Sequence, residues 1–419
     1  MTERFGVSAV SLVGNILLAA MLMPDDFGLL AMLAIFTSMT YALVDCGMSD
    51  ALLREPDATY RDFSTMFWFN VAVGVVIAVL FAALSPLVAQ FFGRAELQPI
   101  MSVLGIGAVF SALAITPMTR LRSRLRFGLL AIVGISAIVL ALTLALLIAW
   151  YGGGYWALVE MQVGYAFFYW LMVTIAARWW PQWQFDWQRF AQFWRFGANL
   201  LLSAIVVHVS NNIVAALLGR FYNATQAGYM GQAQKLQQAP VSALEAGISN
   251  ATYASVARVD TPQAQDTAYL RYYRLFTLLL LLGCSLGIAL APVIVGWLFP
   301  ERWLPTVPYL LLLLVWAMVY PLGGFMQVML KLRGRTHVVA GIIVAERIAV
   351  IVSALVLWRY GVAVMLLAFT AISATAMACY WWQVSRCSTL TLRRLALIYL
   401  QGFAIAAIIG LPLWWLIVQ

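Results

Sequence analysis

Residues 226–250 combine the length of a membrane-spanning helix with polar side chains that a lipid-facing helix does not carry. On a helix, residues three or four positions apart fall on one face. An ionisable group near the bilayer centre costs about 3 kcal/mol and normally faces protein or water. We therefore expect one polar face that binds a substrate, with Lys235 as its main cation. The members of this stripe are Gly228, Gln232, Lys235, Gln238, Ser242, Glu245 and Ser249.

The chemistry that these residue types offer is recognition of phosphate and of hydroxyl groups. A lysine ammonium binds phosphate as a point charge, and side-chain amides hydrogen-bond sugar hydroxyls. Two alternatives remain open: Lys235 extends to the lipid headgroups, and the asparagines hydrogen-bond neighbouring helices instead. The expected substrate-binding residues are Lys235, Gln232, Gln238, Asn211, Asn212 and Asn15.

Three carboxylates inside apolar runs are candidates for a gate or for ion coupling. Asp45 and Glu245 lie near the ends expected to face the cytoplasm, where helix capping or ion pairing across an inner gate is the simplest role. Glu160 lies near the opposite end of its run, where a carboxylate can serve proton or sodium coupling. The four cysteines are single and there are two histidines, so we expect no metal, disulfide or other cofactor.

Composition indicates what kind of protein positions these groups. With 64% hydrophobic residues, 10% charged residues and a mean hydropathy of +0.91, the chain is expected to be an all-α polytopic membrane protein. A net charge of +9 would suggest nucleic-acid binding in a soluble protein. Here the arginines lie between apolar runs and act as topology signals, so no nucleic-acid partner is expected.

Thirteen apolar runs predict the membrane spans and their direction. Basic residues concentrate in alternate connections, which predicts a cytoplasmic amino terminus and, if every run crosses, a periplasmic carboxyl end. The connections expected outside hold only Arg94, Arg220, Arg302 and Arg359. The runs are 6–23, 28–48, 65–88, 98–119, 127–150, 154–177, 196–218, 228–250, 272–298, 304–330, 337–358, 361–382 and 395–418.

The chain repeats itself at an offset near 206. Residues 85–99 match residues 291–305, and the basic turn at 120–126 matches the one at 331–335. Six spans per repeat is an even number, so we expect two six-helix lobes related by a pseudo-two-fold axis along the membrane normal. The predicted parts are an N-lobe at 1–178, an interfacial amphipathic linker at 179–195, a C-lobe at 196–386 and an extra C-terminal span at 387–419.

Several motifs carry a family resemblance in their order and spacing. Pro24, Asp26, Phe27 and Gly28 follow the first span, Asp45 and Gly47 end the second, and further segments are FFGRAELQP, GYWALVEMQ (154–162), LLGRFYNATQAGY and LFPERWLPTVP. About residues 6–386 resemble bacterial polysaccharide exporters. These are the Wzx-like flippases of the multidrug/oligosaccharidyl-lipid/polysaccharide (MOP) superfamily, whose fold is MATE-like.

The resemblance implies a transporter rather than an enzyme. Its expected substrate is an undecaprenyl-pyrophosphate-linked oligosaccharide, moved by alternating access across the bacterial inner membrane for O-antigen, capsule or exopolysaccharide synthesis. Membrane lipid and polysaccharide assembly proteins are the other expected partners. A cation-coupled multidrug antiporter of the same fold is the alternative. A glycan polymerase or ligase would need a large outer loop with catalytic groups, and the expected outer loops are short.

Overall fold

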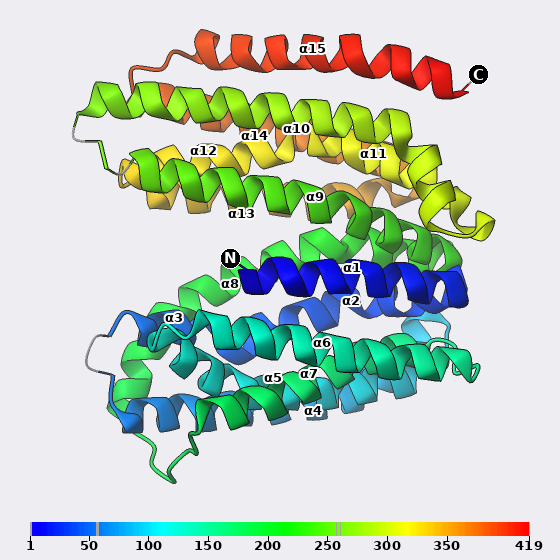
Figure 1. The fold of residues 1–419 in the computed structure, drawn as a ribbon, viewed down its shortest axis with the longest axis vertical. Helices are drawn as coiled ribbons and strands as arrows, with labels where there is room; N and C mark the ends of the chain where they lie inside the picture. Colours follow the sequence, from blue (N-terminus) through cyan, green and yellow to red (C-terminus); the bar gives the residue numbers. More distant parts are fainter. Residues whose placement is uncertain (1, 56–57, 257, 260, 419) are drawn as a thin grey trace. The chain divides into compact units, whose positions relative to one another are not determined.

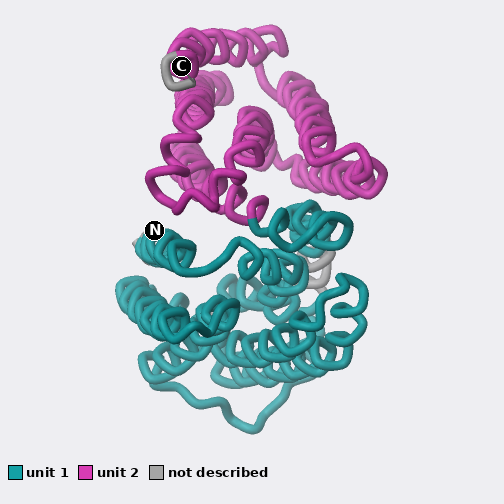
Figure 2. The backbone as a smooth tube through the Cα atoms, turned by 90° about the vertical axis from the view of Figure 1, so that its right-hand side faces the viewer, with its two compact units in different colours: residues 1–228 teal, residues 229–419 magenta. Residues whose placement is uncertain are grey.

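Every regular element that the structure describes is a helix. The structure is a computed structural model that describes the backbone of residues 2–55, 58–256, 258–259 and 261–418; the side chains of residues 2–5, 193, 195–203 and 416–418 are outside the description. The chain forms two compact units, Met1–Gly228 and Tyr229–Gln419 (Figure 2). Each unit is described by itself below.

Unit 1 holds a bundle in which α4 packs along α5, α6 along α7, α1 on α6, and α2 on α8 (Figure 1). Helix α9 begins in this unit and continues into unit 2. The helices are α1 (Thr2–Met21), α2 (Pro24–Asp45), α3 (Met48–Leu53), α4 (Tyr60–Phe92), α5 (Leu97–Ser123), α6 (Phe127–Trp150), α7 (Trp156–Ala177), α8 (Trp187–Phe221) and α9 (Ala224–Val256).

Unit 2 is built around α10, which packs along α15, and α14, which packs against α12 and α13. A 3-10 turn, η1, precedes α11, and another, η2, follows α13. The elements are α10 (Pro262–Leu298), η1 (Glu301–Thr306), α11 (Val307–Ala317), α12 (Tyr320–Leu332), α13 (Thr336–Leu357), η2 (Trp358–Tyr360), α14 (Val362–Cys387) and α15 (Leu392–Val418).

Each of the thirteen predicted runs coincides with helical structure. Eleven helices among the described residues are long and apolar enough to cross a membrane, and Gly6–Met21 is a shorter apolar helix. The remaining predicted run corresponds to helix α9, which is long enough to cross a membrane but too polar to count among the apolar helices. The all-α polytopic fold is confirmed, and α9 differs from the other long helices in the way that its sequence indicates.

Local sequence explains where these helices start and stop. Helix α2 begins at Pro24, whose missing N–H costs nothing at this position, and the Asp26 carboxylate accepts a 2.9 Å hydrogen bond from the Met23 N–H. It ends where Cys46 and Gly47 both take left-handed conformations, at φ 46° and 69°. The Pro24-to-Gly28 motif thus opens the second span, and Gly47 closes it.

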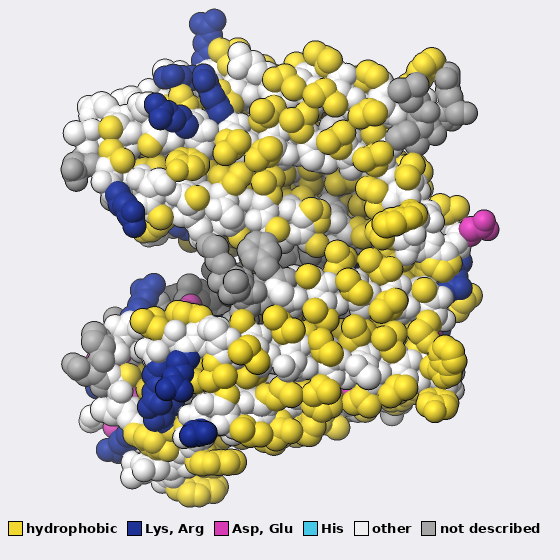
Figure 3. All heavy atoms as spheres, in the orientation of Figure 1, with side chains coloured by type: hydrophobic (Ala, Val, Ile, Leu, Met, Phe, Trp, Pro, Cys, Tyr) yellow, Lys and Arg dark blue, Asp and Glu magenta, His cyan; other side chains and the backbone are white. Residues whose placement is uncertain are grey.

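Basic side chains mark one end of the helices in each unit. In Figure 3 the visible Lys and Arg side chains of unit 1 gather mostly at its α3 end, and those of unit 2 mostly at the end that holds its α12–α13 turn, while hydrophobic side chains cover much of the visible flanks of each unit. Following the predicted topology, we call the basic end of each unit its inner end and the opposite one its outer end.

The two basic turns of the predicted repeat have the same backbone structure. In the α5–α6 turn, Leu125 has a φ of 56°, and its N–H donates to the Arg122 carbonyl. In the α12–α13 turn, Gly334 has a φ of 73°, and its N–H donates to the Lys331 carbonyl. The sequence match at these turns therefore reflects a shared local structure.

Candidate functional site

Helix α9 carries the predicted stripe, and exposure varies along it. Lys235, Gln238 and Ser242 are exposed, whereas Gln232 is 1% exposed. Gln237, which lies off the stripe, is buried as well, and its Nε2 donates a 3.3 Å hydrogen bond to the Tyr320 hydroxyl on α12. The helix thus holds its cation and one amide on an accessible face, while two other glutamines are packed inside.

The predicted asparagines lie on α1 and α8 in unit 1, and all three are half-buried. Asn212 Nδ2 donates to Ser38 Oγ on α2 at 3.1 Å and to the His208 carbonyl at 2.9 Å. Polar bonds between helices of this kind stabilise membrane bundles. Asn212 therefore has a structural partner on α2, which is the alternative left open by the sequence. Asn211 and Asn15 complete the set.

Asp45 is buried at the inner end of α2 and is held by its neighbours. It accepts hydrogen bonds from the backbone N–H of Ser49 at 3.2 Å and from the Ser49 hydroxyl. Thr119 on α5 donates in turn to the Ser49 hydroxyl at 3.0 Å. The carboxylate thus caps α3 and connects α2 to α5, which fits the capping role that its position suggested.

Glu160 lies in a mostly apolar pocket of about 400 Å³ between α5, α6 and α7. Its Oε2 atom is buried with no hydrogen-bond partner among the described groups. A Cβ added at Gly164 would come within 2.0 Å of Oε1, so the carboxylate occupies the space that this glycine leaves. The surrounding rings include Phe110 and Phe167. This is an acidic and aromatic pocket inside unit 1.

Glu245 lies near the inner end of α9 and packs against α12. Its Oε1 would lie 2.1 Å from a Cβ at Gly324, so the two helices approach closely there. The charges of Arg347 on α13 and Lys331 on α12 act on this carboxylate. Within unit 2, the candidate residues Gln232, Lys235, Gln238 and Glu245 follow one another along α9, and the other candidates belong to unit 1.

The structure also shows a cluster of charged residues and glycines at the outer end of unit 1 that the predicted site did not include. Arg94, in the α4–α5 turn, donates to both oxygens of Asp25 at 3.2 and 2.6 Å, and Thr225 at the start of α9 donates to Asp25 at 3.4 Å. This turn lies outside the spans, and the hydrogen bond with Asp25 raises the pKa of Arg94 above its usual value. Asp25 therefore joins α2, the α4–α5 turn and the start of α9.

Two glycines allow α2 and the start of α9 to touch beside this cluster. A Cβ at Gly28 would lie 1.8 Å from the Ala224 carbonyl oxygen, and a Cβ at Gly228 would lie 2.0 Å from the Pro24 carbonyl oxygen. Only glycine permits such close contact between helix backbones. The two glycines were visible in the family motifs, but their contact joins segments that are far apart in sequence.

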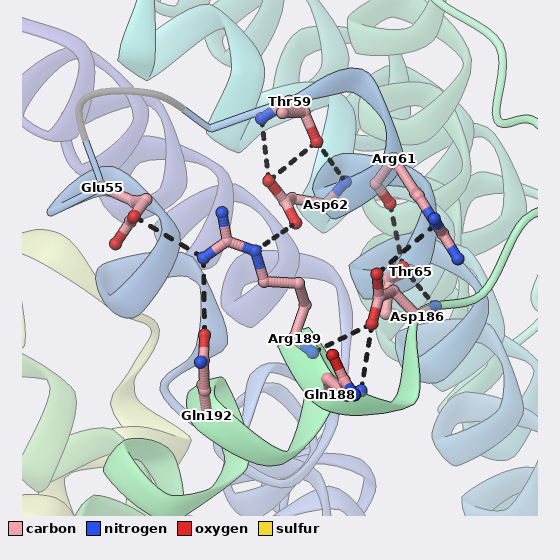
Figure 4. A network of polar contacts seen from close by, with 9 residues as sticks. All are labelled: Glu55, Thr59, Arg61, Asp62, Thr65, Asp186, Gln188, Arg189 and Gln192. Atoms are coloured by element: carbon pink, nitrogen blue, oxygen red, sulfur yellow. Dashed lines mark hydrogen bonds and ion pairs between the residues drawn. The ribbon is translucent and has the colours of Figure 1, made fainter.

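An inner network joins the α3–α4 region to the start of α8 (Figure 4). Asp62 is 2% exposed and forms a capping box with Thr59, in which Thr59 N and Oγ1 each donate to it at 2.8 Å. Arg189 on α8 pairs with Asp62 at 3.4 Å and with Glu55 at 3.6 Å. The capping box was readable as Thr59-x-x-Asp62, whereas nothing in the sequence links it to Arg189.

The tryptophan-rich connection between α7 and α8 docks on the first turns of α4. Trp68 Nε1 donates to the Gln182 carbonyl at 2.8 Å, and the Trp68 ring stacks on Trp183 with centroids 4.1 Å apart. Asp186 then caps α8, whose first residue is Trp187. The helix therefore begins well before residue 196, where the apolar run starts, because Asp186 supplies a strong N-cap.

Comparison with known proteins adds an independent line of evidence. A family model described as polysaccharide biosynthesis protein matches residues 17–308. The teichuronic acid biosynthesis protein TuaB of Bacillus subtilis is 27% identical over 283 residues, which cover 65% of this chain and 57% of TuaB. The lipopolysaccharide biosynthesis protein WzxC of Escherichia coli is 22% identical over 349 residues, 79% of this chain and 68% of WzxC.

Solved structures share the fold at low sequence identity. The lipid II flippase MurJ in an inward closed conformation matches with a TM-score of 0.77 at 11% identity, over 99% of this chain and 96% of MurJ. An inward-facing MATE multidrug transporter matches with a TM-score of 0.69 at 13% identity, over 93% and 95% of the two chains. The chain therefore belongs to the polysaccharide biosynthesis protein family and has the fold that MurJ and MATE share.

Proposed function

We propose that this protein flips undecaprenyl-pyrophosphate-linked oligosaccharide units from the cytoplasmic to the periplasmic leaflet of a bacterial inner membrane by alternating access. The observation that carries the proposal is the accessible polar face of α9 in a chain whose other long helices are apolar. The family supports it, because TuaB and WzxC are named for the biosynthesis of teichuronic acid and of lipopolysaccharide. The product would enter O-antigen, capsule or exopolysaccharide synthesis and would pass to polysaccharide assembly proteins.

A polar helix is needed because the headgroup cannot cross hydrocarbon unaided. Each unsatisfied polar group costs several kcal/mol in the bilayer core. Lys235 supplies a cation for the pyrophosphate, and Gln238 supplies an amide one turn further along the same exposed face. Asn15 and Asn211 are the remaining amides for sugar contact. Asp45 and Glu245 would act near the inner ends of their helices in closing the path.

The test is glycan export in cells that carry single variants, with membrane abundance measured alongside. Lys235→Ala should abolish export at normal abundance, and Lys235→Arg should retain part of it because the charge remains. Gln238→Ala should slow export, since it removes a neutral hydrogen bond of about 1 kcal/mol. Gln232→Arg should not rescue Lys235→Ala, because Gln232 is buried in the packing of α9 and does not share the accessible face.

The matched control is Arg359→Ala, which removes another exposed cation of unit 2. Arg359 lies in η2, away from the candidate residues of α9 in the chain, and its guanidinium carbon is 5.2 Å from the centre of the Trp358 ring. We expect this variant to export normally. Full export by Lys235→Ala would exclude α9 from the substrate path and leave the headgroup role of Lys235.

A multidrug antiporter of the same fold is the second candidate, and the Glu160 pocket favours it. A carboxylate beside aromatic rings, with its Oε2 atom buried and without a hydrogen-bond partner among the described groups, is suited to an ion or an apolar cation. Glu160→Gln would then abolish drug resistance conferred by the expressed protein and leave glycan export unaffected. Slow export by Glu160→Gln that no longer depends on the proton or sodium gradient, where wild-type export does, would instead make Glu160 the coupling residue of the flippase.

A further inference from the structure

An apolar groove lies between α2, α4 and α8 in unit 1, apart from every candidate residue above. Its volume is about 390 Å³, and its lining includes Met32 and Phe36 from α2, Leu87 and Phe91 from α4, and Ala216 from α8. Leu87 and Phe91 are 60% and 55% exposed. The groove is therefore open at the side, where a membrane protein meets lipid chains.

The groove lies at the depth of one leaflet. Helices α4 and α8 end at Phe92 and Phe221, and α2 begins at Pro24, so the outer ends of all three meet there. On α4 the lining runs from Leu84 to Phe92, a length of about 12 Å at 1.5 Å per residue. A single leaflet of hydrocarbon is about 15 Å thick. The groove can thus hold the part of a lipid chain nearest to its headgroup.

Arg220 lies at the outer end of the groove. It is in the last turn of α8 and is exposed, with its guanidinium carbon 5.2 Å from the centre of the Phe91 ring and 5.7 Å from the centre of the Phe221 ring. Stacking on these rings fixes the planar cation above the apolar lining. A cation at this depth lies at the level of lipid phosphates.

No carboxylate among the described residues lies within ion-pair distance of the Arg220 guanidinium. By contrast, Arg94, also at the outer end, pairs with Asp25 at 2.6 Å and with Glu96 at 3.3 Å. Arg220 therefore has its fork of donors available for an outside anion, and Arg94 does not.

Gly219 helps to form the groove. A Cβ at this position would lie 2.3 Å from Met32 Cγ, so the absence of a side chain lets α8 approach α2 closely. This contact sets Met32 at the groove between the two helices. The cavity and the cation at its end are thus produced by adjacent residues of α8.

We propose that this groove binds one anionic glycerophospholipid of the outer leaflet, with an acyl chain along the α2–α4–α8 lining and the phosphodiester on Arg220. A single guanidinium matches the single negative charge of a phosphodiester in a bidentate pair. A pyrophosphate carries more charge than one cation neutralises, which favours a phospholipid over a polyprenyl-pyrophosphate substrate. The site is independent of the proposed transport function.

Native mass spectrometry of the delipidated protein titrated with phosphatidylglycerol tests the proposal. The wild type should bind one molecule tightly. Arg220→Ala should raise the dissociation constant of this molecule about tenfold, because a charge-assisted bond is lost. Arg220→Lys should bind with intermediate affinity. Because Arg220 is exposed, these variants should fold normally, which size-exclusion chromatography checks.

Two further variants separate the groove from a general charge effect. Ala216→Phe fills the groove and keeps the cation, so it should weaken binding as well. Arg359→Ala is the matched control, since Arg359 is also a predicted outer arginine that stacks on a ring, with its guanidinium carbon 5.2 Å from the Trp358 centroid. It should leave the tight binding unchanged.

Three results would overturn the proposal. Equal binding by wild type and Arg220→Ala would show that the cation does not hold the headgroup. Unchanged binding by Ala216→Phe would show that the acyl chain lies elsewhere. Displacement of the bound phosphatidylglycerol by undecaprenyl pyrophosphate at equimolar concentration would assign the groove to a polyprenyl lipid instead.

Discussion

Two buried aspartates hold the inner ends of the two units in different ways. Asp266, near the start of α10, is 1% exposed and accepts from Arg333 at 2.8 Å and from the backbone and hydroxyl of Thr389 at 2.7 and 2.8 Å. Asp62, near the start of α4, accepts from its own cap residue Thr59, and its ion pair with Arg189 measures 3.4 Å. One aspartate is bound by distant segments and the other mainly by its own helix.

The difference shows how firmly each unit holds the chain that leaves its bundle. Thr389 lies in the connection between α14 and α15, so Asp266 fixes that connection with short bonds. Arg189 lies on α8, shares its guanidinium between Asp62 and Glu55, and has a 34% exposed side chain, against 19% for Arg333. Exposed and shared ion pairs contribute little. The bonds of Asp62 therefore hold the start of α8 more weakly than those of Asp266 hold the α14–α15 connection.

The largest expected effect is that of Asp266→Asn. The substitution removes a buried charge that balances Arg333, and breaking a buried pair from one side typically costs about 3 kcal/mol. We expect a lower melting temperature in detergent and a lower yield. Arg335→Ala is the matched control, since Arg335 lies in the same turn and contacts Gln383 only at 3.5 Å. Equal losses of melting temperature and yield in the two variants would show that Asp266 contributes no more to stability than the contact of Arg335.

Asp62→Asn should cost less, about 2 kcal/mol, because the ion pair that it removes is longer and its arginine is more exposed. The amide oxygen can still accept from Thr59, whereas the bond to Arg189 is lost. Its distinctive result should be local. Hydrogen exchange in residues 180–192 should accelerate, while exchange near Thr389 stays unchanged. Arg189→Ala should reproduce the local effect. A uniform acceleration of hydrogen exchange through both units would show that Asp62 does not hold the start of α8 separately from the rest of the protein.

The sequence predicted the helices but not the ion pairs and hydrogen bonds of Asp62 and Asp266. The run predicted at 127–150 matches α6 residue for residue. A continuous apolar stretch of this length crosses a membrane as one helix, because its backbone polar groups must bond to one another there. The start of α8 was missed because the apolar pattern begins well after the Asp186 cap. Asp62 and Asp266 were missed because their partners lie far along the chain. Side-chain contacts between distant helices leave no spacing pattern in one sequence.

The candidate site was predictable to a similar degree. The polar face of α9 follows from helical periodicity alone, and Lys235 and Gln238 are exposed on it. The burial of Gln232 on the same stripe, and the bond from Asn212 to Ser38, depend on which helices pack beside them. Asp25 was overlooked although it lies beside the family motif, because its value as an anchor depends on Arg94 and Thr225.

The paired basic turns allow a smaller test of the same comparison. Leu125 holds the left-handed conformation that Gly334 holds in unit 2, and a residue with a Cβ pays about 1 kcal/mol for it. Leu125 is 75% exposed, so its side chain contributes little packing. Leu125→Gly should therefore raise the melting temperature slightly, and Gly334→Leu should lower it. An unchanged melting temperature in both variants would show that each turn accommodates either residue without a cost in stability.

The smallest expected effect concerns pH at the starts of α8 and α15. Asp186 caps α8 by accepting from the backbone N–H groups of Arg189 and Gln188 at 3.1 and 3.0 Å. Asp186 precedes the span, and these hydrogen bonds, together with the charges of Arg61 and Arg189, lower its pKa below the usual 3.8. The cap of α15 is Thr391, whose hydroxyl accepts from the Arg394 N–H at 3.3 Å and does not titrate in this range.

Because the folded pKa of Asp186 is lowered, its stabilisation is complete above about pH 4 and is lost as pH falls through the folded value. Hydrogen exchange at 186–190, corrected for intrinsic rates, should therefore accelerate below pH 4, while exchange at 391–395 should not. Asp186→Asn should remove this difference in pH dependence, since an asparagine cap carries no titrating group. Parallel acceleration at both helix starts would mean that acid loosens the inner ends as a whole, and the contrast between the two connections would then rest on Asp62 and Asp266 alone.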